Sequence, residues 1–178
     1  MGLTPAPSIE ERASFPARIV ARTGRAVAWL TLAMVLLTFS VVILRYGFNL
    51  GWIWLQESVT YMHTTVFMLA AAWAWQTDDH VRVDIFYRNR TPRQQARINL
   101  FGALLFVVPF CLFLLLGSWD YVAKSWAARE TSREAGGLPL VYLEKSLILL
   151  LPLMLLAQAT VVIQTSLKTL AGKADSKS

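Results

Sequence analysis

Ionisable side chains are almost missing from four long stretches of this chain. The stretches are residues 26–44, 58–76, 100–119 and 146–163, and His63 is the one interruption. A water-soluble helix shows a polar stripe every three or four residues, whereas residues 26–44 are apolar or weakly polar all the way round. Such a helix needs lipid or protein on every face, which excludes an ordinary soluble bundle.

Cysteine and histidine are also scarce. Cys111 is the single cysteine, so no intrachain disulfide can form, and a role as a small hydrophobic residue is favoured. The two histidines, His63 and His80, fall at opposite ends of one stretch, whereas a haem or metal site needs ligands that meet. We therefore expect no cofactor and no metal, and we expect His63 to bond to a neighbouring helix.

The centres of the four stretches hold no Asp, Glu, Lys or Arg. Moving a charged solute through a membrane generally requires ionisable or carbonyl-rich sites at mid-depth. A chain without them is poorly equipped to transport such a solute by itself. Because the spans are poor in charge, we also expect the chain to have no catalytic activity of its own.

Each apolar stretch is long enough to cross a bilayer, because a helix of roughly 20 residues spans a hydrocarbon core of about 30 Å. In a chain of 178 residues, four spans leave no room for a separate soluble domain of ordinary size. The sequence predicts an all-α integral membrane protein with four transmembrane helices in a bundle. Residues 1–25 form a basic N-terminal segment, 26–163 the membrane domain and 164–178 a basic tail.

The basic residues predict the orientation of the spans. Twelve of the 17 Lys and Arg residues fall on the side of both termini and the middle connection, and the acidic residues divide six against five. Because basic residues are retained in the cytoplasm, we expect both termini to be cytoplasmic. The charge is suited to anionic lipid headgroups, and a nucleic-acid partner is not expected.

Tryptophan provides an independent indication of the same boundaries, since indole prefers the headgroup level of a membrane. All seven tryptophans lie near predicted span ends: Trp29, Trp52, Trp54, Trp73, Trp75, Trp119 and Trp126. Two signals thus predict the same four spans.

Helix signals also occur outside the apolar stretches. Ser8 and Glu11 have capping-box spacing and precede a mixed basic and apolar run that suits a short interfacial helix, interrupted at Pro16; a disordered basic tail is the alternative. Thr91, Pro92 and Gln94 predict that the third helix begins well before residue 100, and it could extend to Ala128. Pro109 and Pro152 should bend their spans.

Two charged residues flank the first connection. Arg45 closes the first span and Glu57 opens the second, so both should lie at one interface within reach of each other. An ion pair there would hold the hairpin together, although an exposed pair contributes little stability.

Three short motifs give the chain a family likeness over about residues 20–170. They occur in the order Arg45-Tyr46-Gly47-Phe48-Asn49, Trp54-Leu55-Gln56-Glu57 and Asp79-His80-Val81-Arg82-Val83-Asp84. The chain resembles the small membrane subunit of tripartite ATP-independent periplasmic (TRAP) transporters, whose pattern is R-Y-x-x-N, W-x-E-E and G-x-H-x-x-V-D. Two positions depart from it: Gln56 replaces an acidic residue and Asp79 a glycine.

The resemblance implies structural or interface roles for Arg45, Tyr46, Asn49, Trp54, Glu57, His80, Arg82 and Asp84. It also implies a bacterial inner-membrane importer, sodium-coupled and specific for an organic acid. In such an importer a periplasmic solute-binding protein captures the solute and a large elevator-type membrane subunit moves it. This chain would brace the large subunit, with loop 120–145 as a transient contact for the binding protein.

Two other classes fit parts of the sequence. His63 would suit the membrane anchor of a haem-bearing redox complex, and Glu57 would suit a proton-coupled site in a small four-helix multidrug exporter. Glu57 lies too close to the predicted outer boundary of the membrane to suit the proton-coupled site of an exporter.

Overall fold

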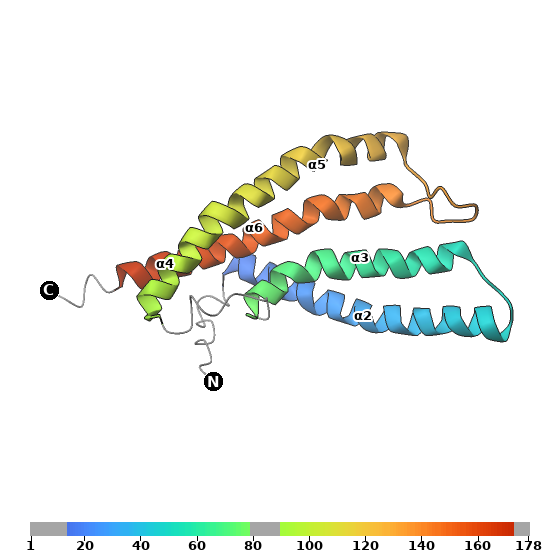
Figure 1. Cartoon of the computed structure of the whole chain (residues 1–178), viewed down its shortest axis with the longest axis horizontal. Coiled ribbons are helices and arrows are strands. Elements are labelled where there is room, and N and C mark those ends of the chain that lie inside the picture. The colour runs from blue at the N-terminus through green and yellow to red at the C-terminus, as the bar shows by residue number, and fades with distance from the viewer. Residues whose placement is uncertain (1–13, 79–89, 173–178) are drawn as a thin grey trace.

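The computed structural model describes residues 14–78 and 90–172, and every regular element in these ranges is helical. In chain order the elements are α2 (Phe15–Gly47), α3 (Ile53–Gln76), α4 (Pro92–Gly102), the π-helix η2 (Ala103–Val107), α5 (Val108–Ala128) and α6 (Val141–Ala171). Figure 1 shows two long hairpins side by side, α2 with α3 and α4–α5 with α6. Both helix-to-helix turns, 48–52 and 129–140, lie at one end of the bundle, which we call the turn end.

Helix α6 is the centre of the bundle, because it contacts α2, α3, α4 and α5. It also carries more of the buried residues than any other helix, including Pro152, Gln158 and Ala159. Helices α3 and α5 flank α6 without packing against each other along their length. The two hairpins therefore meet mainly through α6.

The α2–α3 hairpin depends on one close approach between helices. Gly24 is buried against the indole of Trp73, and a Cβ at Gly24 would overlap the ring. Nearby, the Gln76 side-chain amide donates to the Ala17 carbonyl at 3.0 Å. A glycine at position 24 lets the backbone of α2 lie directly against a large aromatic side chain of α3.

The third long helix begins at the predicted residue. The Thr91 hydroxyl accepts from the Gln94 amide and the Gln94 side chain accepts from the Thr91 amide, which completes a capping box. The helix continues through η2 and α5 to Ala128 and stops at Arg129, whose φ is 43°. Both the early start and the end at Ala128 are confirmed.

The π-helical turn of η2 lies directly before Pro109. Proline has no amide hydrogen, and its ring clashes with the carbonyl four residues earlier in a regular α-helix. Widening the ladder, as in the bond from the Val108 amide to the Ala103 carbonyl, relieves that clash. Pro152 is instead accommodated inside α6, where it is buried.

The N-terminal part of α2 differs from the sequence prediction. Residues 15–25 continue directly into the first apolar stretch as one helix of 33 residues, and Pro16 stands in its first turn, where a missing amide hydrogen costs nothing. The Ser8–Glu11 capping signal lies outside the described residues.

Three helical stretches in the described ranges are long and apolar enough to cross a membrane: Phe15–Gly47, Pro92–Ala128 and Val141–Ala171. Helix α3, with 24 residues, is the remaining predicted span and is not among them, since its half at the turn end carries several polar side chains.

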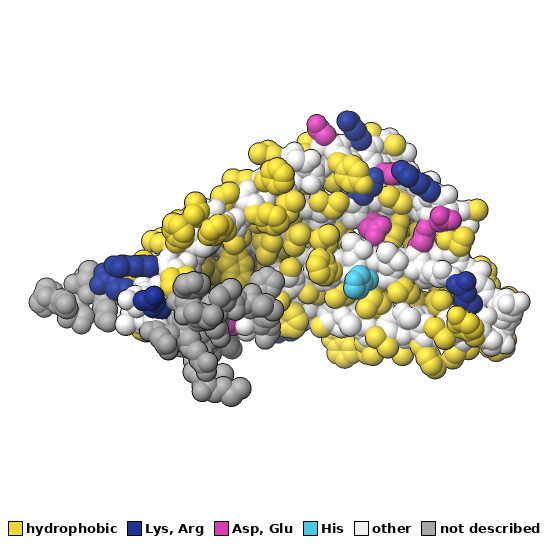
Figure 2. Space-filling view, in the orientation of Figure 1, with side chains coloured by type: hydrophobic (Ala, Val, Ile, Leu, Met, Phe, Trp, Pro, Cys, Tyr) yellow, Lys and Arg dark blue, Asp and Glu magenta, His cyan; other side chains and the backbone are white. Residues whose placement is uncertain are grey.

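Apolar side chains cover much of the surface. On α2 they include Trp29, Leu32, Leu36, Phe39 and Ile43, each more than 40% exposed. Figure 2 shows apolar side chains over most of the visible face, with the charged side chains of the described residues gathered mainly toward the turn end and toward the opposite tip. This distribution is typical of a protein whose middle is surrounded by lipid.

Candidate functional site

The most strongly organised polar region is the turn end, where the 129–140 loop lies over α3 and α6. The loop is closed on itself by bonds from the Ser132 amide to the Leu138 carbonyl (3.1 Å) and from the Gly137 amide to the Glu134 carbonyl (3.0 Å). Gly136 supplies a left-handed turn with φ of 78°. The result is a compact loop with its own internal bonds.

Glu57 fastens this loop to α3. Its carboxylate accepts a hydrogen bond from the Ser132 hydroxyl and another from the Leu138 amide at 2.6 Å. A Cβ at Gly137 would meet both the Ser132 side chain and the Glu57 carboxylate, so glycine is required there for the approach. One carboxylate on the first hairpin thus holds the connecting loop of the second.

Glu130 makes a second attachment at the other end of the loop. It accepts from the Ser125 hydroxyl at 2.7 Å and pairs with the Lys145 ammonium, which also lies 4.1 Å from the centre of the Tyr121 ring. The Lys145 hydrogen bond, followed by the one from Ser125, holds the pKa of the Glu130 carboxyl below its usual range. Glu130 therefore joins α5 to α6 in its ionised form.

Further contacts connect the helices below the loop. The Trp126 indole donates to the Ser146 hydroxyl at 2.8 Å, and its ring packs edge-on against Tyr142 at 4.9 Å. The Thr64 hydroxyl lies 3.1 Å from Glu144 Oε1 and so connects α3 with α6. The turn end is therefore cross-linked by hydrogen bonds between side chains.

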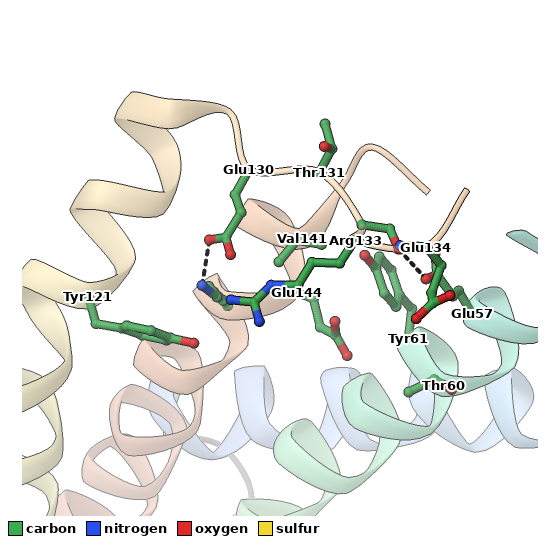
Figure 3. A pocket seen from close by; sticks show the side chains of 12 residues that line it. Glu57, Thr60, Tyr61, Tyr121, Glu130, Thr131, Arg133, Glu134, Val141 and Glu144 are labelled. Carbon is green, nitrogen blue, oxygen red and sulfur yellow. Dashed lines mark hydrogen bonds and ion pairs between the residues drawn. The ribbon is translucent and has the colours of Figure 1, made fainter. Parts of the chain in front are cut away.

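A cavity of about 410 Å³ opens between these contacts, and we call it the turn-end cavity. Figure 3 shows its lining residues arriving from α3, α5, the loop and α6, with Tyr61 rising from α3 toward the loop. The Tyr61 hydroxyl is buried and has no hydrogen-bond partner among the described residues. The charged residues of the lining are Glu57, Glu130, Arg133, Glu134, Glu144 and Lys145.

The structure places five of the eight residues singled out from the sequence at the turn end, but it does not assemble them into one site. The side chains of Arg45, Tyr46 and Trp54 are exposed, and Arg45 is not among the partners of Glu57. Bonds from Ser132 and Leu138 stand in place of the expected ion pair. The other three residues, His80, Arg82 and Asp84, lie outside the described residues.

Asn49 has a conformational role. Its φ is 56°, a left-handed value that asparagine adopts more readily than most residues, and it follows the end of α2. The Leu50 amide then bonds back to the Leu44 carbonyl at 2.9 Å. The asparagine of the R-Y-x-x-N pattern ends the helix and starts the turn toward α3.

Sequence reasoning missed the partners of the two carboxylates. Glu130 and Lys145 are 15 residues apart and Glu57 and Ser132 are 75 apart, so no local spacing relates them. The adjacent glycines Gly136 and Gly137 were a readable signal for a tight loop.

The structure does not support a ligand role for His63. Its side chain is exposed, and it makes no hydrogen bond within the described part of the chain, contrary to the expected bond to a neighbouring helix. Among the described residues no three His, Cys, Asp or Glu side chains are grouped as a metal site requires.

Three membrane-length apolar helices with a charged, hydrogen-bonded turn end define a multi-pass membrane protein. Residues 34–168 match the family described as "Tripartite ATP-independent periplasmic transporters, DctQ component". The chain belongs to this family, whose members are transporter subunits of the inner membrane and not enzymes. The resemblance drawn from the three motifs is confirmed.

Two curated relatives are similar over about half of the chain. The "C4-dicarboxylate TRAP transporter small permease protein DctQ" of Vibrio cholerae is 33% identical over 89 residues, which are 50% of this chain and 38% of the relative. A "Putative TRAP transporter small permease protein" of Haemophilus influenzae is 30% identical over 86 residues, 48% of this chain and 53% of the relative. The chain thus matches about half or less of each relative's length, and no solved structure matches it.

Proposed function

We propose that this chain is the small scaffold subunit of a sodium-coupled TRAP importer for an organic acid, and that it braces a larger, elevator-type membrane subunit. The observation that carries the proposal is the lack of Asp, Glu, Lys and Arg through the centres of the apolar stretches in a member of a transporter family. An elevator needs a part that stays still while another part slides. A charge-poor bundle is suited to that stationary role.

The proposal includes α3 as a fourth span, with both ends of the chain in the cytoplasm. At about 1.5 Å per residue the 24 residues of α3 measure roughly 36 Å, enough to cross the hydrocarbon core. Helix α3 lies between α2 and α6, so two of its sides are covered by apolar neighbours. The excess of basic residues at the termini supports the orientation.

The turn end then faces the periplasm. We propose that residues 120–145, which are the 129–140 loop and the adjoining ends of α5 and α6, contact the solute-binding protein transiently. Arg129, Arg133 and Glu134 are exposed on a loop that Glu57 and Glu130 already hold in place. A loop ordered before binding loses less conformational entropy on docking. Contacts between exposed charges should weaken as salt is raised.

The test is reconstitution of the chain in proteoliposomes, alone and together with the large membrane subunit of its transporter. Uptake of a panel of labelled C4-dicarboxylates and other small organic acids, with a sodium gradient, is measured after adding the binding protein. We expect uptake only when both membrane subunits are present. Solute uptake by this chain alone would overturn the scaffold role, and uptake by the large subunit alone at the full rate would show that no brace is needed.

A further inference from the structure

The exposed face of α3 carries an amide and an imidazole, whereas the middle parts of α2 and α5 expose apolar side chains or hydroxyls. Three of the polar side chains of α3 that turn inward are bonded: Glu57 to the loop, Thr64 to Glu144, and Thr65 to the Tyr61 carbonyl at 2.7 Å. Gln56, Thr60 and His63 instead lie on the exposed side. Their spacing of four and then three residues puts them on one helix face, which continues with Phe67.

These three side chains are poorly satisfied within the chain. The Gln56 amide and the His63 imidazole make no side-chain hydrogen bond to the described residues, and the Thr60 hydroxyl reaches the Gln56 carbonyl only at 3.5 Å. Exposed hydroxyls on α2 behave differently, since Thr38 and Ser40 bond to carbonyls of their own helix at 2.8 and 2.9 Å. An amide or an imidazole on a helix face needs a partner outside the helix.

The position of His63 along α3 makes a hydrogen-bond partner outside the helix especially necessary. Along α3 it is nine residues from Trp54 and ten from Trp73, about 14–15 Å from each. If these indoles mark the two headgroup regions, the imidazole is close to the bilayer centre. Lipid tails offer no hydrogen bonds, so a polar side chain there is normally turned toward protein.

The turn-end cavity continues this polar face. Thr60 belongs to both, and the cavity adds the unpartnered Tyr61 hydroxyl and the Glu144 carboxylate, for which Thr64 is a neutral donor. Lys145 already pairs with Glu130. The turn-end cavity therefore offers the Tyr61 hydroxyl as a donor and carboxylates such as Glu144 as acceptors whose charge is not fully neutralised. The cavity is large enough to hold a side chain.

We propose that the α3 polar face (Gln56, Thr60 and His63) and the adjoining turn-end cavity form the seat for a transmembrane segment of the larger membrane subunit. The segment would place hydrogen-bonding groups against Gln56, Thr60 and His63 and a basic side chain in the cavity. The exposed sides of α2 and α5, with Phe39 and Phe113 62% and 72% exposed, are left to lipid. This inference rests on the proposed function, because it names which surface meets the partner.

Site-specific photo-crosslinking in the intact transporter tests the inference. A benzoyl-phenylalanine is placed at residue 60 or 63 on α3, and at residue 39 on α2 or 113 on α5 as matched controls at exposed membrane-facing positions. We expect adducts with the larger subunit from residues 60 and 63 at several times the yield from residues 39 and 113. Each variant is first checked for co-purification of the complex.

A second measurement separates assembly from folding. Because Thr60 and His63 project away from the bundle, Thr60→Val and His63→Leu should leave the melting temperature of the separately purified chain unchanged. Recovery of the larger subunit in a pull-down should fall about threefold for each interhelical hydrogen bond lost. Phe39→Leu is the control and should change neither.

The outcomes are distinguishable. Adducts only from residues 39 or 113, adducts with a second copy of this chain or with lipid, or no adduct at all from an intact complex would each overturn the inference and leave the scaffold role standing. Failure of any larger membrane protein to co-purify with the unaltered chain would overturn the scaffold role as well.

Discussion

Glu57 shows how a single residue can act across the whole turn end. It lies in the second turn of α3, yet both of its hydrogen bonds go to the 129–140 loop, more than 70 residues away. Gly137 leaves the room that the carboxylate needs. Glu57 is therefore a positioning residue for the loop, which gives a physical reason for an acidic residue at this place in the W-x-E-E pattern.

Glu57→Gln should loosen the loop while leaving the helices folded. The amide keeps one acceptor but presents an NH₂ group where the carboxylate had a second oxygen, so one hydrogen bond to a charged acceptor is lost. Such bonds contribute about 1.5–3 kcal/mol, so exchange of the Leu138 amide should accelerate tenfold or more. Hydrogen exchange with mass spectrometry measures it, with Glu134→Gln as the control, since the Glu134 side chain is exposed. Equal exchange in both variants would contradict the role.

Glu130 predicts a dependence of stability on acid. Its folded-state pKa lies below the ordinary value of a glutamate, so its contribution is complete above that ordinary value, about 4.3, and is lost as the pH falls through the folded-state pKa. The melting temperatures of the unaltered chain and of Glu130→Gln should differ at pH 7 and converge below about pH 4. A difference that persists unchanged into acid would show that the carboxylate charge is irrelevant.

At the scale of the elements, the hairpins depend on small residues at the points where helices meet. Gly24 allows α2 to approach Trp73, whereas Gly117 on α5 has open space around it. Glycine is thus required at position 24 but not at position 117, and only the tertiary contact with Trp73 distinguishes the two positions. Pro109 is a second case in which the structure determines the effect of a residue, because the π-helical turn of η2 accommodates its ring without ending the helix.

Gly24→Ala should destabilise the α2–α3 hairpin, because the new methyl group overlaps the Trp73 side chain close to its backbone. Overpacking of this kind costs about 1–3 kcal/mol. Gly117→Ala is the control and should be neutral or stabilising, since alanine is the better helix former by about 1 kcal/mol. Unfolding of the chain in detergent, followed by circular dichroism, compares the two, and equal stability would contradict the close approach.

At the scale of the whole molecule, two hairpins share α6 as a common centre and are fastened together at the turn end. The exterior is apolar over α2 and α5, and the polar groups concentrate on α3 and the loop. The bundle therefore has one polar side and two apolar sides. Each side favours a different environment within the plane of the membrane. That asymmetry is consistent with the proposed contact between α3 and one neighbouring protein within the membrane.

The proposed orientation can be tested by labelling from each side of the membrane. In a Cys111→Ser background, single cysteines replace Arg133 in the loop, or Thr91 and Thr169 near the opposite end of the bundle. A membrane-impermeant maleimide should label residue 133 in intact spheroplasts and residues 91 and 169 only after permeabilisation. Labelling of residue 169 from outside would reverse the assignment.

The sequence by itself determined that the chain is helical, that it carries membrane-length apolar stretches, and where the third long helix starts. These features depend on local signals: the capping box at Thr91 and Gln94 and the absence of charge over about 20 residues. The three motifs also determined the family, because their order along the chain needs no three-dimensional information.

Only the tertiary structure decided what the polar residues do. Glu57 turned from an expected partner of Arg45 into the anchor of a distant loop, and His63 from a bonded residue into an exposed one. Sequence spacing gives the face of a helix on which a residue lies, but it does not give the neighbour which that face meets. The neighbour depends on how the two hairpins pack around α6, and hydrogen bonds across 75 or 81 residues become visible only in that arrangement.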